Sequence, residues 1–391
     1  MIDFAWMEVL SVFVASLLVV AWSHPIVRKV AVKRNIMDNP DARKLQKESV
    51  PVMGGVAVFF GLITGLCVEY AFVNISGMLP IFIAMSLMLC VGIMDDVSGL
   101  SPWLRFLIEI LVVVMLIFST KISLNSLHGL WGVYDLPMWL SVPLTIVSIV
   151  GVINAINLID GVDGLSSGFC MMASVAFGIF FYKCGNLAML LFCVISFGSL
   201  MPFFFHNVFG EKSKMFIGDG GTLMMGLVMS TYIVTTIASR DVFLQSVSGS
   251  AGLVAFTMAV MAVPVFDTLR VMAMRILRGV SPFRPDKTHL HHLFIDLEFS
   301  HIGTTLSVLF LNFMVILSWW ISYELGATVD TQFYVVVISG FTVTAVFYKF
   351  MRLQISSDTK IAQFMRRVGR TTHFESRKSW QTLQRCMDFR K

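Results

Sequence analysis

Eleven apolar segments divide this 391-residue chain, each close to the roughly 20 residues that a helix needs to cross a bilayer. Lipid offers no water to unpaired backbone groups, so such segments must form helices. Only 14% of the residues are charged, whereas a soluble domain carries about 25%. The sequence therefore predicts an all-α polytopic membrane protein. Its predicted spans are 5–23, 53–72, 78–94, 104–120, 138–156, 165–182, 187–205, 222–239, 251–267, 304–322 and 331–348.

Basic residues are distributed very unequally between the loops. One alternating set of loops holds 26 of the 29 Lys and Arg residues, and the other holds only Lys121, Lys183 and Arg240. Positively charged loops stay on the cytoplasmic side of a membrane. We therefore predict a periplasmic N-terminus, about eleven spans and a cytoplasmic C-terminus. The sequence thus divides into a transmembrane domain over 1–348 and a basic tail over 349–391. The tail is either solvated or in contact with anionic lipid headgroups.

Aspartates at the predicted cytoplasmic helix ends are the most unusual polar residues of the chain. Asp95 and Asp96 are adjacent, Asp160 and Asp163 lie in a Gly-rich stretch, and Asp219 precedes another span. Carboxylates at a membrane boundary are costly unless they are hydrated, paired or bound to a cation. Together they predict a shared cleft for a divalent ion such as Mg²⁺, which prefers oxygen ligands. Considered singly, the first pair could be solvated near a helix N-terminus, and Asp219 could be an N-cap.

The segment NAINLIDGVDGLSSG, residues 154–168, concentrates acids, amides and glycines. Asp160 and Asp163 are three residues apart, so a helical turn would place them on one face, and Asn154 and Asn157 have the same offset. The glycines permit close approach of a phosphate. The alternative is an ordinary polar junction between a helix and a loop.

The longest predicted cytoplasmic loop, residues 270–294, combines basic side chains with imidazoles. Arg284 follows an amphipathic helical stretch, and His289, His291 and His292 come soon after it. Such groups are good anion clamps. A zinc site is a more specific alternative interpretation of the histidines, although no thiolate accompanies them. Three plain surface histidines are the simplest alternative.

Five motifs, taken in order, resemble those of the polyprenyl-phosphate N-acetylhexosamine-1-phosphate transferases of the WecA/TagO type, which are related to MraY. The resemblance covers roughly residues 40–300 and implies ten or eleven transmembrane helices with a cleft that faces the cytoplasm. Two departures stand out, because Gly99 takes the place of the third acid of DDxxD, and a leucine interrupts the HHH run of the MraY type. The motifs are PVMGG at 51–55, DD at 95–96, NAINLIDGVDGL at 154–165, FIGDGGT at 216–222 and HLHH at 289–292.

The resemblance also implies a reaction that requires Mg²⁺, with Mn²⁺ as the alternative ion. N-acetylhexosamine-1-phosphate, most often GlcNAc-1-phosphate, passes from a UDP-sugar to undecaprenyl phosphate, and UMP is released. This reaction initiates a cell-surface polysaccharide such as O-antigen, common antigen or teichoic acid. The implied location is the bacterial inner membrane, with the active site facing the cytoplasm. A homodimer is compatible with the family, and no nucleic acid is an expected partner.

Residue roles follow from the resemblance by position. Asp219 resembles the principal magnesium ligand, and Asp95 and Asp96 resemble a catalytic pair that assists the metal or the lipid phosphate. Asp160 and Asp163 match the acids of the DGxDG motif. An ion- or proton-coupled transporter is the main alternative, but its carboxylates would lie near the bilayer midplane. The expected substrate-binding residues are Asn157 in the same motif, Asn207 and Phe216 near uracil, and Lys47, Arg284, His289, His291 and His292 near the diphosphate.

Overall fold

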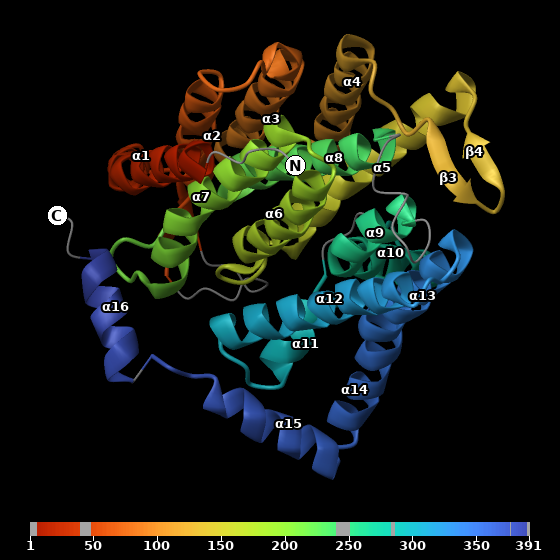
Figure 1. Cartoon of the computed structure of the whole chain (residues 1–391). Coiled ribbons are helices and arrows are strands. Elements are labelled where there is room, and N and C mark those ends of the chain that lie inside the picture. The colour runs from red at the N-terminus through yellow and green to blue at the C-terminus, as the bar shows by residue number, and fades with distance from the viewer. Residues whose placement is uncertain (1–5, 40–47, 240–250, 283–285, 376, 389–391) are drawn as a thin grey trace.

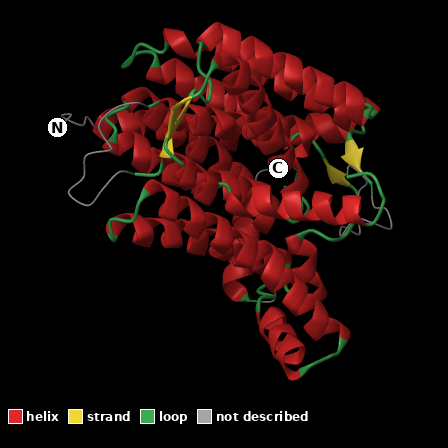
Figure 2. Cartoon of the chain, turned by 90° about the vertical axis from the view of Figure 1, so that its right-hand side faces the viewer, coloured by secondary structure: helices red, strands yellow, loops and turns green. Residues whose placement is uncertain are grey.

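The computed structural model describes residues 6–39, 48–239, 251–282, 286–375 and 377–388 of the chain. Helices make up almost all of this part, together with two small two-stranded sheets (Figures 1 and 2). The predicted all-α class is therefore confirmed. The helices at the predicted spans are α1 (Trp6–Lys33), α2 (Gly54–Glu69), α3 (Leu79–Ser98), α4 (Pro102–Thr120), α5 (Met138–Ile159), α6 (Leu165–Lys183), α7 (Leu187–Phe209), α8 (Gly218–Ala238), α9 (Leu253–Val260), α10 (Ala262–Leu277), α12 (His301–Glu324), α13 (Val329–Phe341) and α14 (Phe347–Ser356).

Length and apolar composition qualify most of these helices as membrane spans. Within the described residues, nine helices meet both criteria, or ten if the bent pair α9–α10 counts as one span. Helix α2 is apolar but has only 16 residues. The chain is thus a multi-pass membrane protein with about nine or ten spans, and the predicted eleventh requires that α2 also cross.

Helix α8 lies at the centre of the bundle and has the largest buried share of all the spans, 89% of its most apolar window. Two glycine pairs explain how closely its neighbours approach. A Cβ atom on Gly92 of α3 would lie 2.3 Å from the Cα of Gly220, and one on Gly55 of α2 would lie 2.4 Å from the Cα of Gly221. Only glycine permits two backbones to come this close. The first turn of α8 is therefore held tightly between α2 and α3.

The predicted span at 251–267 is not one continuous helix. The chain instead forms α9 and α10, which are bent by 77° at Met261. Asn312 of α12 stabilises this break, because its side-chain oxygen accepts the Val263 N–H at 2.8 Å and its Nδ2 donates to the Val260 carbonyl at 3.0 Å. A break inside a membrane would otherwise leave backbone groups unpaired.

A hairpin that the sequence did not predict connects α4 to α5. It consists of β3 (Ser126–Leu130) and β4 (Val133–Asp135). Its tip is bound to α13, since the Trp131 N–H donates to Asp330 at 2.7 Å and the Trp131 indole donates to Tyr334 at 3.0 Å. The other small sheet pairs β1 (Met37–Asp38) with β2 (Val50–Pro51), just before α2.

The basic tail has regular structure and partners within the chain. The last span continues through α14 to Ser356, and α15 (Lys360–Thr371) and α16 (Lys378–Asp388) follow. These two helices run from the end of α14 back towards α7, past the short α11 (Leu290–Asp296) and the start of α12 (Figure 1). The tail therefore returns to the part of the molecule that holds the candidate site.

We expect Asn312→Ala to destabilise the protein by about 2 kcal/mol, because two hydrogen bonds of about 1 kcal/mol each are lost at the break between α9 and α10. The measurement is the thermal unfolding midpoint in detergent. Ser307→Ala is the matched control on the same helix, because the Ser307 hydroxyl bonds only to the Gly303 carbonyl of its own turn. Equal midpoints for the two variants would show that Asn312 does not stabilise the break.

Candidate active site

Polar residues from four helices meet at one end of the bundle. Asp95 and Asp96 lie in the last turn of α3, and Arg105 lies in the first turn of α4. Asn157 lies near the end of α5, and Asp219 lies in the first turn of α8. We call the acids Asp95, Asp96, Glu109 and Asp219 the carboxylate cluster.

Asp96 holds the N-terminus of α8. Its Oδ1 accepts the Asp219 N–H at 3.0 Å, and its Oδ2 accepts the Gly220 N–H at 3.3 Å. The first N–H groups of a helix have no partners within the helix, and a carboxylate there is also favoured by the helix dipole. A Cβ on Gly218 would lie 2.5 Å from Asp96 Oδ2, so glycine is needed at this position. This arrangement favours a positioning role for Asp96, with both of its oxygens already bound.

Arg105 is the cation of the carboxylate cluster, and sequence reasoning missed it. Its guanidinium lies 3.0 Å from Asp95, 3.6 Å from Glu109 and 3.7 Å from Asp219. Glu109 also accepts a hydrogen bond from Asn154 Nδ2 at 2.5 Å. The available signal was the helical i,i+4 spacing of Arg105 and Glu109 just after the adjacent aspartates. One guanidinium therefore faces three carboxylates.

Asp219 is the most exposed of the three acids that contact Arg105. Its side chain is 35% exposed, against 13% for Asp95 and 0% for Glu109. Asn157 Nδ2 donates to Asp219 Oδ1 at 2.6 Å and to the Thr222 hydroxyl at 2.8 Å. Asn157 therefore orients one oxygen of Asp219 and leaves the other on the side of Arg105.

The donor set fits Mg²⁺ better than a metal that needs a complete protein cage. Within the described ranges, no group of three or more His, Cys, Asp or Glu side chains is arranged to hold a metal ion. Mg²⁺ characteristically uses one or two carboxylates, several waters and substrate phosphates. Asp95 and Asp219, which both face Arg105, can supply two such carboxylates.

The DGVDG loop, residues 160–164, forms a second group beside the cluster. Its acids do not share the face of a helical turn, because α5 ends at Ile159 and α6 begins only at Leu165. Asp160 accepts a hydrogen bond from Ser166. Asp163 turns the other way, and its Oδ2 lies 2.6 Å from Lys214 Nζ and 2.7 Å from His301 Nδ1. The helical offset therefore predicted the proximity of the two acids but not their orientation.

The two acids of this loop have opposite electrostatic surroundings. Burial raises the pKa of Asp160 to about 7; the Ser166 hydrogen bond opposes this rise, and the charges of Asp219 and Asp163 add to it. Burial would also raise the pKa of Asp163, but the His301 and Lys214 contacts outweigh it and hold that pKa below its usual value. Asp163 is therefore ionised at neutral pH, whereas Asp160 loses its proton close to pH 7.

The HLHH segment lies against the DGVDG loop. His289 Nδ1 lies 3.0 Å from Asp267 Oδ2, and Arg270 also binds Asp267, so α10 anchors the segment. A Cβ on Gly161 would lie 2.4 Å from His291 Nε2. Burial, and then the neighbouring imidazoles, lower the pKa of His291, and burial and His289 lower the pKa of His292 to about 4. These two imidazoles are therefore neutral at pH 7.

Asn207 and Phe216 hold the loops around the site. Asn207 is 5% exposed, accepts the Gly164 N–H at 2.7 Å and donates to the Met215 carbonyl at 3.0 Å. Phe216 bridges to the strand before α2, where its N–H donates to the Pro51 carbonyl at 2.8 Å. Lys214 Nζ lies 5.7 Å from the centre of the Phe216 ring, and the hydrogen bonds of Asn207 favour a positioning role. The predicted Lys47 and Arg284 lie outside the described residues.

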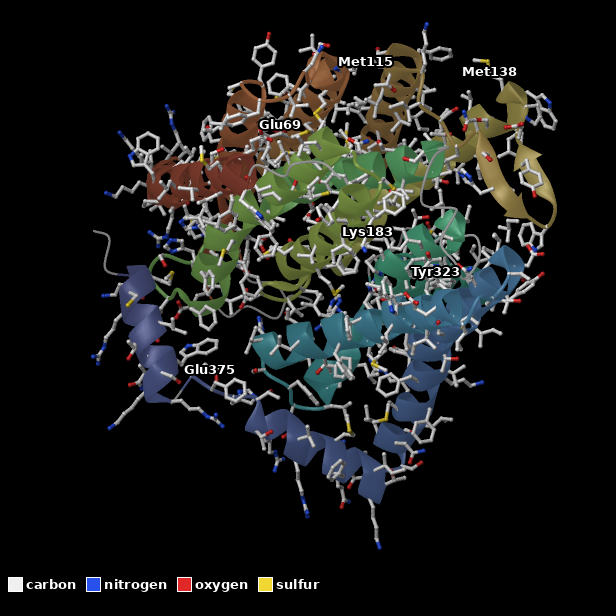
Figure 3. The ribbon with its side chains drawn as sticks, in the orientation of Figure 1. Glu69, Met115, Met138, Lys183, Tyr323 and Glu375 are labelled. Carbon is white, nitrogen blue, oxygen red and sulfur yellow. The ribbon has the colours of Figure 1, made fainter. Side chains whose placement is uncertain are left out.

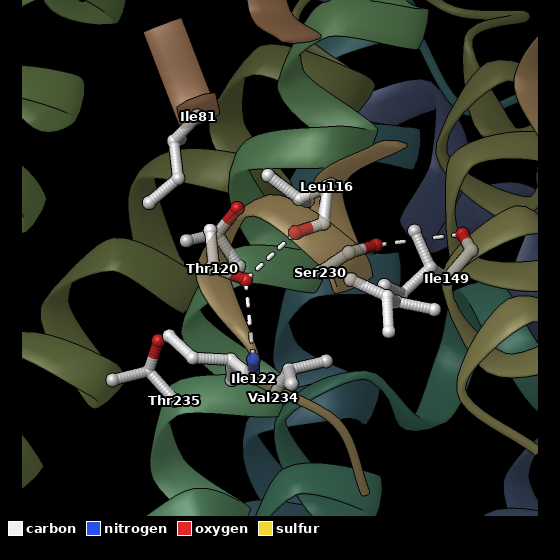
Figure 4. A pocket seen from close by; sticks show the side chains of 10 residues that line it. Ile81, Leu116, Thr120, Ile122, Ile149, Ser230, Val234 and Thr235 are labelled. Atoms are coloured by element: carbon white, nitrogen blue, oxygen red, sulfur yellow. Dashed lines mark hydrogen bonds between the residues drawn. The ribbon is translucent and has the colours of Figure 1, made fainter. Parts of the chain in front are cut away.

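A pocket between α3, α4, α5 and α8 is separate from the acids (Figure 4). Ser230 on its wall lies eleven residues beyond Asp219, which is about 16 Å along α8. The hydroxyls of Thr120, Ser230 and Thr231 on its wall donate to backbone carbonyls. The lining of the pocket carries no charged side chain. Its lining is Ile81, Leu116, Ile117, Thr120, Ile122, Ile149, Ser230, Thr231, Val234 and Thr235.

Comparison with known proteins supplies independent information. Residues 78–237 match the model of glycosyl transferase family 4. A Bacillus subtilis protein named "Probable undecaprenyl-phosphate N-acetylglucosaminyl 1-phosphate transferase" is 30% identical over 319 residues, which cover 81% of this chain and 86% of that protein. Proteins named "Undecaprenyl-phosphate alpha-N-acetylglucosaminyl 1-phosphate transferase" are similar too. The one from Salmonella typhi is 26% identical over 70% of this chain and 73% of its own, and that from Haemophilus influenzae is 29% identical over 69% and 74%.

The raised pKa of Asp160 predicts that stability falls as pH rises. The folded chain keeps this proton up to about pH 7, whereas an unperturbed aspartate carboxyl loses it near pH 3.8. The protonated carboxyl therefore stabilises the folded state fully below the unperturbed pKa. Up to ~4 kcal/mol of this stability is lost as the pH rises through the pKa of folded Asp160. Asp160→Asn should therefore lessen the decline of the thermal unfolding midpoint between about pH 4 and 7, measured in detergent with EDTA. Asp330→Asn, on α13, should keep the wild-type slope, and an unchanged slope in Asp160→Asn would contradict the assignment.

Proposed function

The chain belongs to the polyprenyl-phosphate N-acetylhexosamine-1-phosphate transferase family, and on that premise we propose that it transfers GlcNAc-1-phosphate from UDP-GlcNAc to undecaprenyl phosphate. The products are undecaprenyl-diphospho-GlcNAc and UMP. The observation that carries the proposal is the relative of 30% identity that covers most of both chains. The meeting of α3, α4, α5 and α8 around the carboxylate cluster supports it, since this is where the motif residues gather.

The proposed reaction exchanges one phosphorus–oxygen bond for another. An oxygen of the lipid phosphate attacks the β-phosphorus of UDP-GlcNAc, and the bond from that phosphorus to the bridging oxygen breaks. The electron pair leaves with UMP. The lipid phosphate is already largely ionised at neutral pH, so no strong base is obligatory. The greater difficulty is electrostatic, because two unit charges 4 Å apart repel by ~4 kcal/mol at an effective dielectric constant of 20.

The side chains of the site suggest how this repulsion is overcome. We propose that Asp95 and Asp219 hold Mg²⁺, with Mn²⁺ as a substitute, and that Asp96 keeps Asp219 in place through the first turn of α8. When bound, the ion would neutralise phosphate charge and stabilise the charge that develops on the leaving UMP. Arg105 compensates the carboxylates around it.

The second group of residues suits the donor diphosphate. Lys214 and His301 meet at Asp163, and the neutral His291 and His292 can donate hydrogen bonds to phosphate oxygens. Asp160 titrates near neutral pH, because burial and then the charges of Asp219 and Asp163 raise its pKa, so its charge depends on both groups. We assign this side of the site to the UDP-sugar and the carboxylate cluster to the ion and the attacking phosphate.

We propose that the carboxylate cluster faces the cytoplasm of a bacterium, where UDP-sugars are found, across its inner membrane. The asymmetry of Lys and Arg supports a cytoplasmic C-terminus and a periplasmic N-terminus, with α2 as the eleventh span. The acids then lie at helix ends near the lipid surface, within reach of a lipid phosphate. A transporter site would instead lie near the bilayer midplane.

Replacement of Asp219 by Asn should lower Mg²⁺-dependent UMP release by about a hundredfold or more, because it removes a charge that the transition state requires. The assay contains purified protein, undecaprenyl phosphate and UDP-GlcNAc, and it measures UMP and the label moved into the organic phase. Asp330→Asn is the matched control, since Asp330 binds Trp131 on the hairpin away from the site. Full turnover by Asp219→Asn would remove Asp219 from the metal site.

The orientation predicts the activity of reporter fusions. Alkaline phosphatase, which is active only outside the cytoplasm, should be inactive when fused after Lys391 and active when fused after Trp131, in the hairpin between α4 and α5. The measurement is phosphatase activity per amount of fusion protein in whole cells. Activity at the C-terminal fusion, with none at Trp131, would reverse the proposed topology.

A further inference from the structure

The C-terminal segment, residues 357–388, contacts both of the segments that hold Asp163. Lys214 comes from the α7–α8 loop, residues 210–217, and His301 is the first residue of α12. Helices α15 and α16 pass from one of these segments to the other, and Glu375 lies in the connection between them (Figure 3). We call this segment the C-terminal strap; the structure describes it over 357–375 and 377–388.

The first attachment of the strap is at the start of α12. Thr372 Oγ1 accepts the Ser300 N–H at 2.9 Å, and the Ser300 hydroxyl donates to the Thr372 carbonyl at 2.7 Å. A Cβ on Gly303 would lie 2.3 Å from Thr372 Oγ1, so the Thr372 side chain lies directly against the backbone of α12. Arg370 adds an ion pair with Glu298. Ser300 immediately precedes His301, and this attachment therefore holds the residue that contacts Asp163.

The second attachment is at the α7–α8 loop. The Trp380 ring packs on Phe209 with 4.6 Å between centroids. Asp388 Oδ1 accepts the Ser213 N–H at 2.9 Å, and Gln384 Nε2 donates to Glu211 at 2.6 Å. Ser213 immediately precedes Lys214. The strap thus binds the chain one residue away from each of the two partners of Asp163.

The two partners of Asp163 need an external constraint. Lys214 and His301 approach the same oxygen, Asp163 Oδ2, from different parts of the chain. Two positively polarised donors at one oxygen repel each other, and loops that carry them can separate by small shifts. Asp219 follows this loop in α8 but is fixed separately, because Asp96 accepts its N–H at 3.0 Å and Asn157 donates to its side chain at 2.6 Å.

We propose that the C-terminal strap is a positioning element of the active site, in which Trp380 and Asp388 hold Lys214 and Thr372 holds His301 against Asp163. This inference rests on the proposed function and deepens it, since it assigns the strap to binding of the UDP-sugar. Loss of the strap contacts widens the donor side of the site and leaves the chemistry at Asp95 and Asp219 intact.

The first test compares strap variants kinetically. Trp380→Ala and Asp388→Ala should each raise the KM for UDP-GlcNAc by ~10-fold, the equivalent of about one charge-assisted hydrogen bond. The kcat and the KM for undecaprenyl phosphate should stay within about twofold. Thr382→Ala is the matched control on α16, because the Thr382 hydroxyl bonds only to the Lys378 carbonyl of its own helix. Variants that match this control, or that lower kcat without raising the donor KM, would overturn the proposal.

The second test does not depend on activity. Glu211→Cys with Gln384→Cys, in a Cys386→Ser background, should be crosslinked in native membranes by a short bismaleimide, because these side chains touch. In a protein that carries both the cysteine pair and Trp380→Ala, crosslinking should return the KM for UDP-GlcNAc to the wild-type value. A pair that does not crosslink would overturn the docking of the strap. Crosslinking of the double-cysteine variant, together with a wild-type protein that transfers no sugar, would refute the proposed function and leave the docking intact.

Discussion

Mutual repulsion of carboxylates at the end of a membrane bundle is the constraint on which this structure depends. Two carboxylates 4 Å apart repel by ~4 kcal/mol at an effective dielectric constant of 20. The molecule compensates this with the Arg105 guanidinium, the backbone amides at the start of α8 and the Asn157 amide. Asp219 nevertheless remains one-third exposed and faces Asp95 across Arg105. A cation and a phosphate can approach from that side.

The scaffold keeps these charges together through close backbone packing. Gly92 and Gly55 bring α3 and α2 against the first turn of α8, so Asp96 reaches the amides of that turn. The end of α5 then joins the two parts of the site, because Asn157 orients Asp219 while the DGVDG loop leads to Lys214 and His301. In the proposed function, the ion and the nucleotide sugar would therefore bind to neighbouring residues of one helix end.

Much of this could be predicted from the sequence, and the failures have identifiable causes. Hydropathy located the spans because lipid permits only paired backbone, and the acids were conspicuous because charge at a membrane boundary is rare. Hydropathy could not predict the break at Met261, since Asn312, which satisfies it, lies about 50 residues away. Arg105 could not be told apart in the sequence from any other basic residue in a loop, so its contact with the acids was missed. The contacts of Trp380 and Asp388 join residues that are far apart in the chain. Long-range pairing leaves no local pattern to read.

The central claim, that carboxylates of α3 and α8 share one divalent ion, is tested most directly by Mn²⁺ binding followed by electron paramagnetic resonance of the purified protein without substrates. The account predicts one bound Mn²⁺ per chain, displaced by excess Mg²⁺, with the signal of bound ion lost in both Asp95→Asn and Asp219→Asn and kept in Asp330→Asn. Retention of the bound ion in either of the two cluster variants, at the wild-type affinity, would contradict a shared site.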